Sequence, residues 1–172
     1  VYEGNETAII AISAVSGSSA LENGTQSVTV TITENESAPT ITLATSATSI
    51  AENSSDTITL TATASQVADE DITVTLATTG TGTDGTDYSA VNATTITISA
   101  GDTTGTKTFT MTDDSVSEGS ETAIVAISGV SGGGASESGT QSVTVTISDN
   151  DSPQITLTSS VSTLAENSSS TV

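Results

Sequence analysis

Acidic side chains gather at a few places in this sequence, and most of those places follow a segment with the alternating pattern of a β-strand. Asp113 and Asp114 come directly after one such segment, and Asp149 and Asp151 come after the last one. Further acids stand at similar places, at Glu52, Asp84, Asp87 and Asp102. Many carboxylates without His or Cys select a hard cation, and Ca²⁺ above all. If the strands alternate in direction, the ends of alternate strands meet, so we expect these acids to share a calcium site at one pole of the fold.

The composition excludes most other chemistry. The 172 residues include 21 Asp or Glu and one basic residue, Lys107, which gives a net charge of −20. A chain with this charge cannot neutralise phosphates, so we expect no nucleic-acid binding. Without His or Cys there is no imidazole base, thiol nucleophile or disulfide, and nothing activates the 37 Thr and 29 Ser, so we expect no enzyme. The longest apolar run, residues 8–12, is too short to span a membrane.

The elements that must position the acids are strands. Seven segments alternate aliphatic residues with Thr or Ser, the period of two that indicates strands with one buried face. They lie around residues 41–43, 58–62, 72–76, 96–98, 109–111, 123–127 and 143–147. No segment shows a sustained helical period. The sequence predicts an all-β fold, an antiparallel β-sandwich, with 69–71 as a charged hairpin tip and 131–139 as a flexible tip between the last two strands.

An internal repeat of about 115 residues organises the chain. Residues 1–37 align with 116–152, with 26 of 37 positions identical, and 39–58 align with 153–172, with 11 of 20 identical. We therefore expect 1–37 to be the C-terminal part of one repeat, 38–152 a complete repeat, and 153–172 the N-terminal strand region of the next. The chain then reads as a stretch of a longer tandem array.

The run DDSVSEGSETAIVAIS from Asp113 resembles the signature of Calx-β domains, in which an Asp pair precedes an E-G-x-E and the penultimate strand. GTDY at 85–88, AGD at 100–102 and SDND at 148–151 fall where that family has similar elements. The resemblance implies tandem immunoglobulin-like sandwiches that bind Ca²⁺ at one pole, near the junction with the next domain. By position, the implied ligands are Glu52, Asp87, Asp113, Asp114, Asp149 and Asp151, with Asp84 and Asp102 as further candidates. The first repeat ends instead with Glu34 and Glu36, whose longer side chains change the reach of any ligand there.

Each motif also has a structural interpretation. Asp149 and Asp151 suit a turn or linker, because Asn and Asp favour such positions, and the Asp pair at 113–114 suits a solvated loop. Glu118 and Glu121 read as ordinary residues at the start of a strand rather than as ligands. A separate pattern is that every Asn lies in an N-x-S/T sequon, a candidate for N-glycosylation. These are Asn5, Asn23, Asn35, Asn53, Asn92, Asn150 and Asn167.

Two functions remain. The first is a structural or adhesive array outside the cell, at its surface (a filament, a sheath or an adhesin stalk), stiffened by calcium at its junctions. Its partners would be neighbouring repeats, or other copies in a filament. The alternative is a Ca²⁺-sensing regulatory module of a larger protein, the role that Calx-β domains play in some ion exchangers. The scarcity of Lys and the abundance of Thr and Ser favour the array. A sensor should respond near micromolar calcium, and a stalk at millimolar levels.

Overall fold

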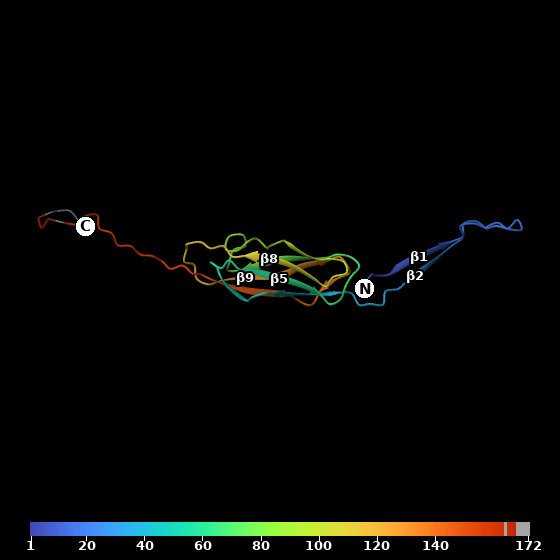
Figure 1. Ribbon diagram of the computed structural model, residues 1–172, viewed down its shortest axis with the longest axis horizontal. Coiled ribbons are helices and arrows are strands. Elements are labelled where there is room, and N and C mark those ends of the chain that lie inside the picture. Colours follow the sequence, from blue (N-terminus) through green and yellow to red (C-terminus); the bar gives the residue numbers. More distant parts are fainter. Residues whose placement is uncertain (164, 168–172) are drawn as a thin grey trace.

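The structure is a computed structural model that describes residues 1–163 and 165–167 (Figure 1). Its main body is a β-sandwich formed by residues 40–148. A two-stranded hairpin, β1 (Glu6–Ala11) and β2 (Ser27–Ile32), extends from one end of the sandwich. The chain leaves the other end as an extended segment, so the three parts follow one another along the long axis.

Nine strands make up the sandwich. They are β3 (Thr40–Thr45), β4 (Ser49–Ala51), β5 (Thr57–Ala64), β6 (Ile72–Gly80), β7 (Thr95–Ile98), β8 (Thr104–Thr110), β9 (Glu121–Ser131), β10 (Ser136–Glu137) and β11 (Ser142–Ser148). One sheet has the order β10–β3–β5–β8, and the other has the order β4–β11–β9–β6–β7. All seven predicted strand segments form strands, and the all-β sandwich is confirmed. Residues 1–163 and 165–167 contain no helix that is long and apolar enough to cross a membrane.

Alternation along the strands builds the core between the sheets. In β5, the side chains of Ile58, Leu60 and Ala62 are almost fully buried, whereas the Thr residues between them face outward. The two buried aromatic rings, Tyr88 and Phe109, pack with their centroids 5.6 Å apart. Burial of the aliphatic face holds each strand in register, because a slip of one residue would expose that face to water.

Alternating strand direction separates two poles. The pairings bring the ends of β4, β6, β8 and β11 together with the start of β9, at what we call the acidic pole (Glu52, 81–88, 112–121 and 149–151). The opposite pole consists of 67–71, 99–103 and 132–135. There the N–H of Gly101, in the turn between β7 and β8, donates to the carbonyl of Ala68 at 2.9 Å. Asp102 belongs to this turn, so the expectation that it shares a pole with the other acids is wrong: β7 runs antiparallel to β6 and ends at the far side.

Several connections differ from the predicted ones. The predicted strand around 41–43 forms β3, and a short further strand, β4, follows it in the other sheet. The connection at 69–71 crosses from β5 in one sheet to β6 in the other, so it is not a hairpin tip. The connection at 131–139 contains β10, which pairs in parallel with β3. These are long-range pairings, which local alternation does not reveal.

The hairpin repeats part of the sandwich in register. Ala8 pairs with Val30 in β1–β2, just as Ala123 pairs with Val145 in β9–β11. Val145 is fully buried, however, whereas Val30 is 45% exposed. Past the sandwich, Ile155 and Leu157 are almost fully exposed, although they align with the buried Ile41 and Leu43 of β3. Both ends of the chain thus carry core-type residues that nothing covers here, and the predicted repeat boundaries stay a prediction.

Candidate metal centre

The pairing of β4 with β11 brings the first acids of the acidic pole together. Ala51 pairs in parallel with Ser148, and the N–H of Glu52 donates to the carbonyl of Ser148 at 3.0 Å. Glu52 therefore emerges beside Asp149, which follows β11. One carboxylate oxygen from each of Glu52, Asp149 and Asp151 lies within 4.8 Å of the others. We call these three residues the inner cluster.

Asp149 anchors the backbone around it. Its Oδ2 accepts hydrogen bonds from the N–H groups of Glu118 (2.9 Å) and Gly119 (3.0 Å) and from the Ser117 hydroxyl (3.3 Å). Its Oδ1 accepts from the N–H of Asp151 at 2.7 Å. These bonds, those from Gly119 and Asp151 above all, lower the pKa of Asp149. Asp149 thereby stays ionised and ties the loop before β9 to the segment that leaves the sandwich.

Glu52 is in the opposite electrostatic situation. Its side chain is only 8% exposed, and its Oε1 has no hydrogen-bond partner. Burial, and then the negative charges of Asp149, Asp151, Asp114 and Asp113, raise the pKa of Glu52 to about 7. Oδ2 of Asp151 is also buried without a partner. Unpaired buried carboxylate oxygens are costly, and a cation between them is one partner that could satisfy both.

A second group of acids, the outer cluster, lies at the same pole. It consists of Asp87 from the loop between β6 and β7, Glu118 from the loop before β9, and Glu121 at the start of β9. One oxygen from each lies within 4.8 Å of the others. Partial burial, with the negative charge of Asp87 next, raises the pKa of Glu121. Carboxylates held this close repel one another unless a proton or a cation lies between them.

The two clusters form one electrostatic unit. Partial desolvation is the main cause that raises the pKa of Glu118, and the negative charges of Asp114, Asp87 and Asp149 raise it further. Asp87 belongs to the outer cluster and Asp149 to the inner cluster. Asp113 and Asp114 act on Glu52 as well, so both belong to the same field. The two clusters and the Asp113–Asp114 pair together hold eight carboxylates: Glu52, Asp87, Asp113, Asp114, Glu118, Glu121, Asp149 and Asp151. All available donors are oxygens, as a hard cation such as Ca²⁺ prefers.

Asp84 has a structural task. Its Oδ1 accepts hydrogen bonds from the N–H groups of Val91 (2.8 Å) and Asn92 (3.2 Å), which close the loop between β6 and β7. Closing this loop places Asp87, whose Oδ2 accepts from the N–H of Thr83 at 2.5 Å. Asp84 itself is in neither cluster.

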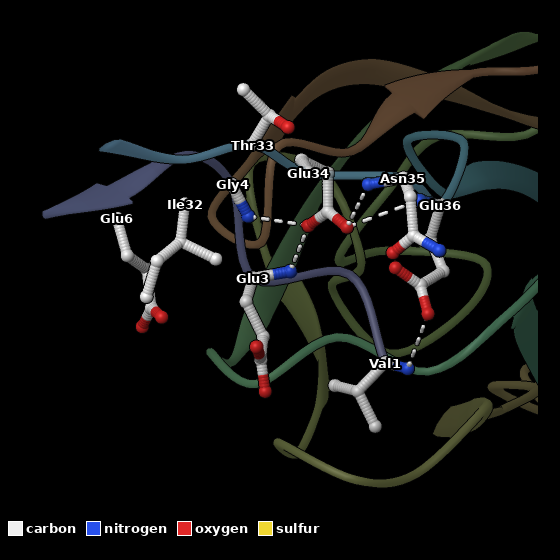
Figure 2. A pocket seen from close by; sticks show the side chains of 9 residues that line it. All are labelled: Val1, Glu3, Gly4, Glu6, Ile32, Thr33, Glu34, Asn35 and Glu36. Carbon is white, nitrogen blue, oxygen red and sulfur yellow. Dashed lines mark hydrogen bonds and ion pairs between the residues drawn. The ribbon is translucent and has the colours of Figure 1, made fainter. Parts of the chain in front are cut away.

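Glu34 and Glu36 lie at the base of the β1–β2 hairpin, in a shallow pocket (Figure 2). The Glu34 carboxylate accepts from the N–H groups of Glu3 (2.6 Å) and Gly4 (2.7 Å) on one side, and of Asn35 (2.9 Å) and Glu36 (3.1 Å) on the other. These bonds, the one from Glu3 first, hold the pKa of Glu34 far below its usual range. Glu34 therefore repeats the anchoring role of Asp149, its counterpart in the complete repeat. Neither Glu34 nor Glu36 belongs to an acidic cluster within the described residues.

Comparison with known proteins identifies the sandwich. The family model of the Calx-beta domain matches residues 34–151. The chain belongs to the Calx-beta family. No curated protein matches the sequence.

Solved structures agree on this fold. The structure described as the apo form of the Calx CBD1 domain aligns with a TM-score of 0.53 and 20% identity, over 65% of this chain and 99% of that one. CBD12 from CALX1.2 aligns with a TM-score of 0.51 and 21% identity, over 60% of this chain and 41% of that one. The calcium binding domain CBD12 of CALX1.1 aligns at 0.53 and 20%, over 63% of this chain and 46% of that one. At these identities the likeness concerns the fold, and this chain spans less than half of the two CBD12 structures.

Sequence reasoning undervalued two residues of this Calx-beta domain. Glu118 and Glu121 were expected to be ordinary strand-start residues, but the structure brings both to Asp87. The available signal was their position within eight residues of the Asp pair, in the loop that enters β9. The predicted sequons are compatible with the structure, because all seven Asn residues are exposed, and glycosylation stays a prediction.

Proposed function

We propose that this Calx-beta domain binds Ca²⁺ at its acidic pole and that the ion stiffens the junction with the segment that follows. The observation that carries this proposal is the pair of buried, unpartnered oxygens, Glu52 Oε1 and Asp151 Oδ2, inside a pole of nine acids. Within the chain, the only basic side chain that could balance the negative charge of the acidic pole is Lys107, in β8. A cation would supply the positive charge that the chain itself lacks.

In this proposal, the two clusters bind separate ions. Glu52, Asp149 and Asp151 would hold one ion, with Asp113 and Asp114 completing its oxygen shell from the loop after β8. Asp87, Glu118 and Glu121 would hold a second. Asp149 keeps the loop and the exit segment together through its backbone hydrogen bonds. Because Asp151 lies in the exit segment, an ion shared with Glu52 would tie that segment to the end of β4.

An array outside the cell fits the rest of the molecule. The internal repeat, the hairpin with the register of β9–β11, and the end-to-end arrangement of hairpin, sandwich and exit segment support tandem units in a line. The net charge of −20 and the abundance of Thr and Ser favour a solvated surface location. In this proposal, the neighbours are repeats of the same chain, and parallel chains could pack into a filament, sheath or stalk.

A regulatory calcium sensor is the second candidate. It is supported by the likeness of the fold to a structure described as a calcium binding domain. The dissociation constant for Ca²⁺ separates the two functions. A stalk should bind Ca²⁺ with a Kd of roughly 10⁻⁴–10⁻³ M, and a sensor with a Kd of roughly 10⁻⁷–10⁻⁵ M.

The test is calorimetric unfolding of residues 1–172 with EDTA and with Ca²⁺, joined to a calcium titration. At about a hundred times Kd, one ion should add roughly 2.7 kcal/mol, or about 10 °C in Tm. Asp113→Asn with Asp114→Asn should abolish or strongly reduce that response. Asp69→Asn, at the opposite pole, is the matched control and should keep it. Identical unfolding with and without calcium would reduce the acidic pole to surface charge and refute the proposal.

A further inference from the structure

Tyr2 docks onto the sandwich at the pole opposite the acids. Its N–H donates to the carbonyl of Val67 at 3.2 Å, and its carbonyl accepts from the N–H of Asp69 at 3.2 Å. The two bonds make a parallel bridge around Ala68, which is itself buried. The segment that carries Tyr2 leads directly into β1, so this bridge joins the hairpin to the sandwich.

The Tyr2 ring lies against Gly134, the last of a run of three glycines. A Cβ added at Gly134 would lie 2.4 Å from Cε1 of Tyr2 and 3.0 Å from its hydroxyl oxygen. A Cβ at Gly133 would lie 2.7 Å from that of Ala68. Both glycines have positive φ, +53° at Gly133 and +61° at Gly134. The absent side chain at Gly134 therefore makes room for the ring, and that at Gly133 makes room for Ala68, which the bridge surrounds. The left-handed backbone at both positions is one that other residues rarely adopt.

We propose that Val67–Asp69 and Gly132–Gly134 form a socket for an aromatic side chain of the preceding repeat, and that Tyr2 is its occupant. The ring contributes apolar contact, and the backbone bridge sets the direction in which the hairpin leaves. That the occupant belongs to a preceding repeat rests on the array proposed above, whereas the socket itself does not. No member of either acidic cluster takes part, so the socket works without calcium.

The same position of the complete repeat is Ser117, which has no ring. Its hydroxyl donates instead to Asp149 at 3.3 Å. The complete repeat therefore cannot offer a tyrosine at this position to a socket beyond it. The joint before the sandwich is held by an aromatic contact, and the joint after it depends on acids. Two successive junctions along one chain thus differ in chemistry.

The test measures the orientation of the hairpin relative to the sandwich in residues 1–172. The chain has no Cys, so spin labels at Thr29→Cys in β2 and Thr108→Cys in β8 report one distance. Gly134→Ala and Gly139→Ala are a matched pair: both have positive φ (+61° and +68°), but nothing lies within 4 Å of a Cβ at Gly139. Tyr2→Ser replaces the tyrosine by serine, the residue that the complete repeat has at the equivalent position, Ser117.

The distance distribution should be narrower in the unchanged chain and in Gly139→Ala than in Gly134→Ala and Tyr2→Ser. Amide exchange at Asp69 should become roughly tenfold faster in the last two variants. In the double variant, Gly134→Ala should broaden the distribution little beyond Tyr2→Ser alone, because without the Tyr2 ring the new Cβ has nothing to clash with. Each result should be the same in EDTA and in Ca²⁺. Failure of the calcium proposal would therefore leave the socket proposal intact. A distribution as narrow in Tyr2→Ser as in the unchanged chain, or equal broadening by Gly139→Ala, would overturn the socket.

Discussion

At the scale of single residues, two neighbouring carboxylates of the acidic pole do different work. Asp149 satisfies backbone N–H groups, and those bonds lower its pKa. Glu52 is buried with an unpartnered oxygen, and burial raises its pKa to about 7. The first carboxylate accepts its backbone hydrogen bonds in the charged form, whereas the second takes up a proton at a higher pH than a free glutamate does.

The raised pKa of Glu52 predicts an unusual pH dependence of the metal-free protein. Between its unfolded value of 4.5 and about 7, folded Glu52 binds a proton that the unfolded chain has released. Stability from this group is therefore complete below the unfolded pKa and is lost as pH rises through about 7. Thermal unfolding in EDTA should show Tm falling between pH 5 and pH 8.

Glu52→Gln is the control for this pH dependence. The amide is neutral throughout, so the fall in Tm between pH 5 and pH 8 should become smaller, leaving the part due to Glu118 and Glu121, whose pKa values are also raised, and the calcium response should weaken. A slope unchanged by Glu52→Gln would assign the pH dependence to other groups.

The anchoring role of Asp149 predicts a cost that does not depend on calcium. Asp149→Ala removes acceptors for the N–H groups of Glu118, Gly119 and Asp151 and should lower the free energy of unfolding in EDTA by about 1–2 kcal/mol. Asp113→Ala, at an exposed position, should change the metal-free value by less than about 0.5 kcal/mol. Equal effects in urea unfolding would mean that Asp149 contributes only charge.

At the scale of elements, the sandwich closes along β7 and β8, which lie in different sheets. Gly105 of β8 passes so close to β7 that a Cβ there would lie 2.3 Å from the carbonyl oxygen of Thr97. The backbone carbonyl cannot move aside as a flexible side chain can. Gly105→Ala should therefore lower the free energy of unfolding by roughly 1–3 kcal/mol. Gly129→Ala in β9 is the control, since its Cβ would meet Thr75 at an ordinary 3.9 Å. Chemical denaturation of both variants measures the difference, and similar midpoints would contradict the close approach.

At the scale of the whole molecule, the hairpin and the exit segment lack the second sheet that would cover them. Ile9, Ile10 and Val28 of the hairpin are each more than 60% exposed, as are Ile155 and Leu157. Two strands alone are marginally stable in water. Limited proteolysis of residues 1–172 with a protease of broad specificity should therefore trim both ends and leave a resistant core close to 38–152. Full protection of both ends in a monomer would contradict this expectation.

The sequence by itself determined the strands and the pole at which most of the candidate acids gather. Alternation of aliphatic residues with Thr is a local property of a strand with one buried face, so each predicted segment could be recognised without its partners. The acids at the ends of alternate strands could be assigned to one pole for the same reason, and Glu52, Asp87, Asp113, Asp114, Asp149 and Asp151 all lie there.

Only the tertiary structure decided which acids meet and what each one bonds. The division between β3 and β4 places Glu52 beside β11, and the direction of β7 sends Asp102 to the far pole. Distances between loops depend on the order of strands in two sheets, and that order rests on pairings between residues far apart in the chain. For the same reason the sequence alone predicts a flexible tip at the three glycines, and only the fold places Tyr2 against Gly134.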